Sequence, residues 1–224
     1  MALGAATGAI YVATYFVLDV ALKQCGVAIS MAAARLSVVM PTAASIMFWA
    51  ERPGWVQYAG IALGVAALPL LTYRRPSAAE AHVRSRWAWL LLPVLFGLNG
   101  AASIVLKYCT WAAHGHSVEF LGALFLTAAA ASVAASLPRS GLGRWRDAGV
   151  GVLLGVANAV PNYAMYVALG MVDGAIAFPV QACGTVLAAT LMAAVLWRER
   201  YSRRTLVGLG LAVIALVLVN VRTQ

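Results

Sequence analysis

One hydrophobic module occurs twice in this chain, and this duplication constrains the fold more than any other feature of the sequence. Residues 49–74 align without a gap with residues 197–222, and ten of the 26 positions are identical, including a shared Trp-x-Glu-Arg. Upstream, residues 20–29 lie over residues 167–176 after a one-residue slip. Leu-, Ala- and Val-rich helices can resemble one another by composition, but the shared motif at a helix end favours a true repeat. A repeated hydrophobic unit is typical of transporters that bind their substrate between the repeats.

The composition excludes a soluble globule. Of the 224 residues 63% are hydrophobic and only 10% are charged, whereas a soluble domain carries about 25% charged residues. The net charge of +9 does not indicate nucleic-acid binding, because the basic residues lie in loops between apolar segments. The three cysteines lie on different segments without metal-ligand or CxxC spacing, and no cofactor is expected. The start of the chain lacks the basic region of a cleavable signal peptide.

Eight apolar segments are long enough to cross a bilayer, which needs about 20 residues per helix. They cover residues 3–22, 27–50, 54–73, 87–109, 117–136, 147–170, 174–197 and 203–221. All seven Trp residues fall at segment ends, where indole rings prefer the lipid headgroups. The sequence therefore predicts an all-α polytopic membrane protein with about eight transmembrane helices.

The basic residues are distributed very unevenly between the two predicted faces. One face receives Lys23, Arg74, Arg75, Arg84, Arg86, Arg139, Arg144, Arg146, Arg198, Arg200, Arg203 and Arg204, whereas the other receives Arg52, Lys107 and Arg222. The positive-inside rule predicts that the first face is cytoplasmic. In the cytoplasmic (inner) membrane, both termini are then predicted to lie on the outer side, away from the cytoplasm.

A polar linker divides the predicted helices into two groups. Residues 74–86 are rich in Pro, Ser and charge and separate three helices (1–73) from five (87–224). The three match the last three helices of the second group, so the first repeat lacks two helices at its start. Repeats with an odd number of helices are antiparallel in the membrane, which predicts an inverted repeat.

Several stretches resemble a known family. The stretches are ERPGWVQYAGIALGVAALPLL, ERYSRRTLVGLGLAVIALVLVN, AIAFPVQACGTVLAATLMAAVLWRER and LLPVLFGLNGAASIVLKY. They resemble the EamA-type transporters of the drug/metabolite transporter (DMT) superfamily. The resemblance covers essentially the whole chain. It implies two inverted repeats around a central cavity, usually ten helices in all, and secondary transport of a small molecule. This chain departs from the pattern by lacking the first two helices.

The densest group of polar residues within an apolar segment lies in residues 156–166. Asn158 and Asn162 share one helix face, Pro161 lies between them, and Tyr163 is adjacent. They could form a wall of the substrate site, or they could join helices through hydrogen bonds. The repeat alignment places Tyr11 and Tyr15 at the positions that correspond to Asn158 and Asn162.

Other polar residues at membrane depth join the predicted site. Asn99, one turn before Ser103, could bind substrate or serve packing. Pro41 and Pro179 interrupt their predicted helices. The run 178–184, in which Gln181 follows Pro179 by two residues, could offer a broken-helix carbonyl to a substrate or could be a tolerated kink. We predict that Asn99, Asn158, Asn162 and Gln181 converge on one cavity, with Tyr15 and Arg35 on the opposite wall.

Asp19 and Arg35 are the most notable charges within apolar segments. They could form a gate or coupling pair. Alternatively, Asp19 could pair with Lys23 one turn away, while Arg35 reaches the interface or binds carbonyls. Within the cavity, Arg35 would favour substrates with an anionic group.

The remaining polar residues are expected to have structural roles. Lys107 and Glu119 are predicted to be solvated near the outer interface. Glu51 and Glu199 are predicted to pair with loop arginines or to cap the next helix. His114 and His116 are not expected to bind a metal.

No catalytic motif is present, so an enzyme is not expected. The leading hypothesis is a secondary transporter of a small metabolite or drug that works by alternating access, in the direction of efflux. The alternatives are a non-transporting assembly or scaffold protein, an inactive transporter fragment, and an intramembrane lipid enzyme. The expected partners are a small-molecule substrate and the lipid bilayer, with no nucleic acid; coupling to protons and formation of a homodimer are left open.

Overall fold

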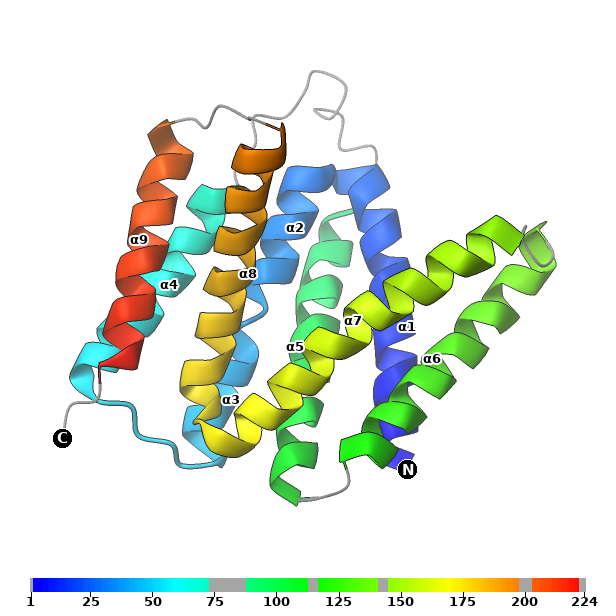
Figure 1. Cartoon of the computed structure of the whole chain (residues 1–224), viewed down its shortest axis with the longest axis horizontal. Coiled ribbons are helices and arrows are strands. Elements are labelled where there is room, and N and C mark those ends of the chain that lie inside the picture. Colours follow the sequence, from blue (N-terminus) through cyan, green and yellow to red (C-terminus); the bar gives the residue numbers. More distant parts are fainter. Residues whose placement is uncertain (1, 73–87, 113–116, 141–144, 198–202, 222–224) are drawn as a thin grey trace.

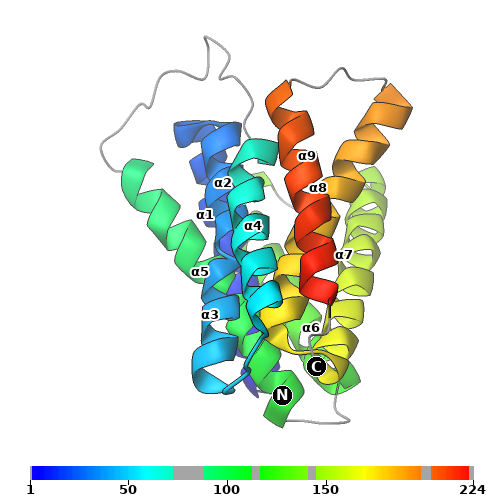
Figure 2. The ribbon, with the colours of Figure 1, turned by 90° about the vertical axis from the view of Figure 1, so that its left-hand side faces the viewer.

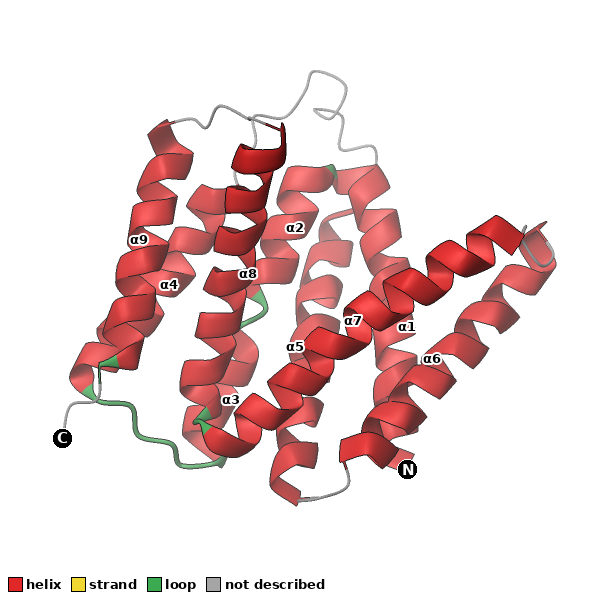
Figure 3. Cartoon of the chain, in the orientation of Figure 1, coloured by secondary structure: helices red, strands yellow, loops and turns green. Residues whose placement is uncertain are grey.

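The fold is a bundle of α-helices. The computed structural model describes residues 2–72, 88–112, 117–140, 145–197 and 203–221, and every regular element within these ranges is a helix (Figure 3). The helices are α1 (Ala2–Cys25), α2 (Val27–Leu36), α3 (Val39–Phe48), α4 (Trp55–Thr72), α5 (Ala88–Ala112), α6 (Ser117–Ser140), α7 (Trp145–Met171), α8 (Gly174–Trp197) and α9 (Arg203–Asn220).

Six spans of the described part are long and apolar enough to cross a membrane, and α2 and α3 together form one of them. The apolar parts of α4 and α6 are shorter, covering Trp55–Leu71 and Glu119–Ala134. The chain is thus compatible with a multi-pass membrane protein, whereas the count of eight spans stays a prediction.

The predicted helix 27–50 is broken into α2 and α3. Pro41 has no backbone N–H, so the carbonyl of Ser37 lacks its usual helical donor. The N–H of Met40 bonds to Ser37 instead, at 3.0 Å, and the N–H of Val38 bonds to the carbonyl of Arg35 at 3.3 Å. These tighter i→i−3 bonds end one helix and start the next, as expected near Pro41.

Of the two alternatives at Pro179, the broken helix is wrong and the tolerated proline is observed, because α8 continues from Gly174 to Trp197 with Pro179 inside it. A proline removes a single backbone hydrogen bond, and buried transmembrane helices tolerate this loss when neighbouring groups compensate.

The closest helix pair joins the two copies of the duplicated module, as α4 and α9 run side by side in both views (Figures 1 and 2). Gly60 of α4 lies against Leu218 and Val219, and Gly208 of α9 lies against Leu70 and Leu71. Glycine lets the two backbones approach in lipid, where burial of apolar surface does not drive helix association.

The remaining helices surround this pair unevenly. α1 packs against α5 and α6, while α8 packs against α3, α4 and α9. α7 crosses the bundle obliquely (Figure 1), and residues 151–157 near its start are all exposed. In Figure 1, α1 runs opposite to α7, the segment formed by α2 and α3 runs opposite to α8, and α4 runs opposite to α9.

We expect Gly60→Ala to destabilise the protein. The new Cβ would lie 2.7 Å from Cγ2 and 2.8 Å from the backbone N of Val219, so helix α4 or α9 must shift, at a cost of about 1–3 kcal/mol. Gly210→Ala is the control, because no described atom lies within 4 Å of its Cβ position. Thermal unfolding of the detergent-solubilised proteins measures the difference; equal stability of both variants would contradict this packing.

Candidate functional site

A cavity of about 440 Å³ lies between helices of both halves of the chain, within the size range of small-molecule sites. Six of the residues that sequence reasoning proposed for substrate binding line it: Tyr15, Arg35, Asn99, Asn158, Asn162 and Gln181. Three segments of the first half (α1, α2 and the start of α3) and three helices of the second (α5, α7 and α8) contribute to the wall.

Four of the lining side chains form a hydrogen-bonded chain between α1 and α7. The Tyr11 hydroxyl donates to Oδ1 of Asn162 at 2.8 Å, and Nδ2 of Asn162 donates to Oδ1 of Asn158 at 2.7 Å. Nδ2 of Asn158 then donates to the hydroxyl oxygen of Tyr15 at 2.8 Å. Every donor points the same way, so the bonds polarise one another and the O–H of Tyr15 ends the chain as a donor.

Arg35 lies in the last turn of α2 and lines the same cavity. Among the described residues, none forms an ion pair with it. Guanidinium keeps its charge in proteins, and the described cavity lining contains neither Asp nor Glu. The cavity therefore combines a fixed positive charge with hydrogen-bond donors, an arrangement that suits a ligand with acceptor atoms or negative charge.

Asn99 supports the break between α2 and α3. Its Nδ2 donates to the carbonyl oxygen of Ala34 at 2.8 Å and to Oγ of Ser37 at 2.7 Å. The carboxamide of Asn99 is thus occupied in holding the cavity wall, whereas that of Gln181, which also lines the cavity, forms no hydrogen bond with the described residues.

Tyr163, predicted to bind substrate, does not line the cavity. It is 50% exposed, because it is five residues from Asn158 and therefore faces about 140° away on an α-helix. Asp19 pairs with Lys23 at 2.6 Å on the exposed face of α1, as one of the two alternatives predicted. No ion pair joins Asp19 to Arg35 among the described residues, so the predicted gate pair is not formed in this conformation.

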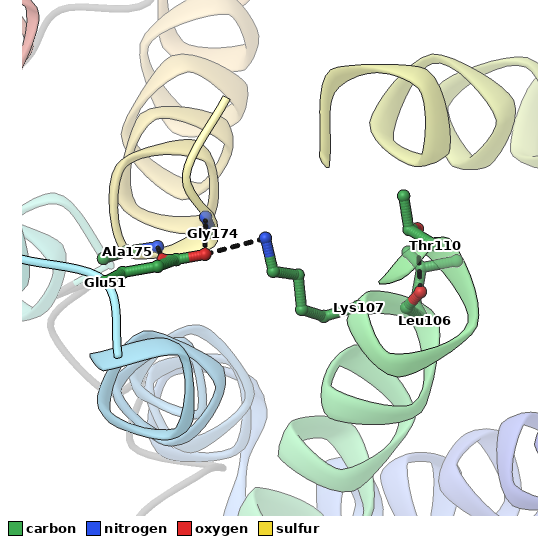
Figure 4. Close-up of polar contacts among 6 residues, drawn as sticks. All are labelled: Glu51, Leu106, Lys107, Thr110, Gly174 and Ala175. Atoms are coloured by element: carbon green, nitrogen blue, oxygen red, sulfur yellow. Dashed lines mark hydrogen bonds and ion pairs between the residues drawn. The ribbon is translucent and has the colours of Figure 1, made fainter. Parts of the chain in front are cut away.

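A buried polar cluster lies at one end of the cavity helices (Figure 4). The carboxylate of Glu51 accepts hydrogen bonds from the backbone N–H groups of Gly174 at 3.0 Å and Ala175 at 2.8 Å. Nζ of Lys107 lies 2.8 Å from the same carboxylate, and the two side chains are only 9% (Lys107) and 7% (Glu51) exposed. Glu51 thus caps α8 and neutralises a buried cation at the same time.

The backbone at Ala50 and Gly174 lets the carboxylate of Glu51 reach the start of α8. Ala50 adopts a positive φ of 54°, which turns the chain after α3 toward the start of α8. A Cβ at Gly174 would collide with Oγ of Ser45 and lie 3.2 Å from Cε of Lys107. Only glycine lets the first N–H of α8 come this close to the carboxylate.

The cluster corrects two sequence predictions. Lys107 is buried and paired, not solvated, because Glu51 supplies its counter-charge. Glu51 caps α8, not the next helix α4, whose start instead has the N–H of Gly54 donating to Oε1 of Gln57. A lysine inside an otherwise apolar segment was the available signal, since such a charge needs a partner at membrane depth. Glu119 is exposed as predicted, whereas Glu199, His114 and His116 lie outside the described residues.

The cluster lies near helices that also line the cavity: Glu51 follows the end of α3, Lys107 is on α5, and Gly174 and Ala175 start α8. Lys107 follows Asn99 by eight residues on α5, about 12 Å along the axis, and Phe178 of the cavity wall is one turn from Gly174. The cluster therefore holds α3, α5 and α8 together beyond one end of the cavity.

Comparison with known proteins shows the fold alone. No family model matches the chain, and no curated protein matches it. A solved structure, described only as the crystal structure of a protein, superposes with a TM-score of 0.75 at 15% identity, over 97% of this chain and 83% of that chain.

We expect Glu51→Gln and Lys107→Met each to destabilise the protein by about 3–5 kcal/mol, because each leaves one buried charge without its partner. The double variant should recover much of this loss, which a double-mutant cycle on unfolding measures. Asp19→Asn is the control: it breaks an exposed pair and should cost at most about 1 kcal/mol. Additive losses in the double variant would mean that Glu51 and Lys107 do not depend on each other.

Proposed function

We propose that this protein is a secondary transporter that moves a small metabolite or drug across the cytoplasmic membrane by alternating access, in the direction of efflux. In this proposal it is similar to the EamA-type transporters, with eight spans, a three-helix repeat and an inverted five-helix repeat. The twelve-charge face is cytoplasmic, and both termini lie outside.

The observation that carries the proposal is a reciprocal contact pattern. The offset that aligns residues 20–29 with residues 167–176, continued toward the N-terminus, pairs Tyr11 with Asn158 and Tyr15 with Asn162. The hydrogen bonds connect Tyr11 to Asn162 and Tyr15 to Asn158. When each residue is replaced by its repeat counterpart, the Tyr11–Asn162 bond becomes the Tyr15–Asn158 bond, as expected for two units related by a two-fold axis.

The second aligned segment gives the same pattern. Gly60 corresponds to Gly208, and residues 70–71 correspond to residues 218–219. Gly60 packs against residues 218–219, and Gly208 packs against residues 70–71. Two independent sets of contacts thus support an inverted repeat with the cavity between its halves, which is where repeat-built transporters bind substrate.

Transport itself is tested in proteoliposomes with candidate amino acids and drugs. We expect Asn162→Ala to reduce transport by at least about tenfold, the effect of losing roughly 1.4 kcal/mol, while folded yield falls much less. Asn220→Ala, which removes an exposed carboxamide outside the central cavity, should leave transport unchanged.

The opposite result for Asn162→Ala, a lost yield with intact specific transport, would assign this carboxamide to packing alone. A folded protein that moves no solute against a range of candidates would favour the scaffold or inactive-fragment alternative.

The orientation has its own test. Reporter fusions at Gln224 and within residues 76–84 should give an external C-terminus and a cytoplasmic linker, because positive loops stay in the cytoplasm. A cytoplasmic Gln224 would contradict this topology.

A further inference from the structure

A second hollow, the side groove, lies between α1, α6 and the exposed first half of α7. Its volume is about 710 Å³, and its walls are mostly apolar. Val12 and Phe16 line it from α1, Leu124 and Phe125 from α6, and Leu154 from α7. In Figure 1, α7 crosses obliquely in front of α1, and α6 leans away from α1 toward the same side.

The side groove meets the central cavity at the hydrogen-bonded chain. Tyr11, Tyr15 and Asn158 line both spaces. A ligand held at Tyr15 could therefore place one part in the cavity and another in the groove.

The two spaces differ in chemistry. The cavity holds the Arg35 cation, and the hydrogen-bonded chain ends in the Tyr15 O–H donor at the junction. The carboxylate of Asp19 lines the groove, but it is paired with Lys23. The cavity thus suits an anionic acceptor group, and the groove suits an apolar chain.

We propose that the ligand of this protein is an anionic amphiphile with a single apolar tail, its carboxylate or phosphate head in the cavity near Arg35 and Tyr15 and its tail in the side groove. This inference rests on the proposed transport function for its physiological meaning, but its test is a binding measurement.

Gly155 offers a selective way to close the groove. It lines the groove but not the cavity, and no described atom lies within 4 Å of its Cβ position. A leucine there would extend from this open position into space that the tail needs. Gly122 of α6 has the same open surroundings and lies outside both spaces, so Gly122→Leu is the matched control.

The experiment measures equilibrium binding of labelled decanoate, butanoate and decyltrimethylammonium to the full chain in lipid nanodiscs, with protein-free nanodiscs as background. Decanoate should bind at least about tenfold more tightly than butanoate, since its longer tail buries several more methylenes. It should also bind more tightly than the cation of equal tail length.

Gly155→Leu should lower decanoate affinity by at least about tenfold and butanoate affinity much less, whereas Gly122→Leu should change neither. Arg35→Gln should weaken both carboxylates but not the cation.

Equal decanoate binding by Gly155→Leu and Gly122→Leu would overturn the groove assignment, and preference for the cation would overturn the head-group assignment.

Nanodiscs with added anionic phospholipid distinguish the source of the amphiphile. Displacement of bound decanoate by the phospholipid would identify a bilayer lipid as a ligand of the same site. Retention of the phospholipid by a protein that binds no decanoate would overturn the single-tailed class. Decanoate binding without transport would refute the transporter but not the ligand class. Transport of short polar solutes that Gly155→Leu does not alter would refute the ligand class but not the transporter.

Discussion

The position of α8 depends on the carboxylate of Glu51. This group comes from the first half of the chain, caps the first turn of α8 in the second half, and holds the Lys107 cation of α5. A buried charge pair needs its remaining hydrogen-bonding capacity filled, and the backbone N–H groups of Gly174 and Ala175 fill it. Because α5 and α8 carry two walls of the cavity, the cluster fixes the geometry in which Asn99 and Gln181 face the same space.

The polar residues of the cavity join helices and also line the proposed binding site. Asn158 and Asn162 do join helices, since they bond to each other and to tyrosines of α1. Their bonds run in one direction, however, so the chain ends at the hydroxyl of Tyr15, which lines both spaces. Interhelical bonding and a binding wall are therefore compatible roles for one set of side chains.

The two halves share contacts but not every detail. The break between α2 and α3 follows Pro41 and is held by Asn99, whereas the corresponding helix α8 is continuous around Pro179. α1 is covered by α5 and α6, while residues 151–157 of α7 are exposed. The side groove lies beside this exposed part of α7, between it and α1 and α6.

The sequence by itself determined the helical class, most helix boundaries and the residue types that line the cavity, because apolar length and the depth of Asn158, Asn162 and Arg35 are properties of the linear chain. It did not determine which partner each polar group finds. Lys107 looked like an interface residue until Glu51, 56 positions earlier, was brought beside it, and Tyr163 looked like a site residue until the rotation of α7 turned it outward. Such pairings depend on the relative placement of helices, which only tertiary packing decides.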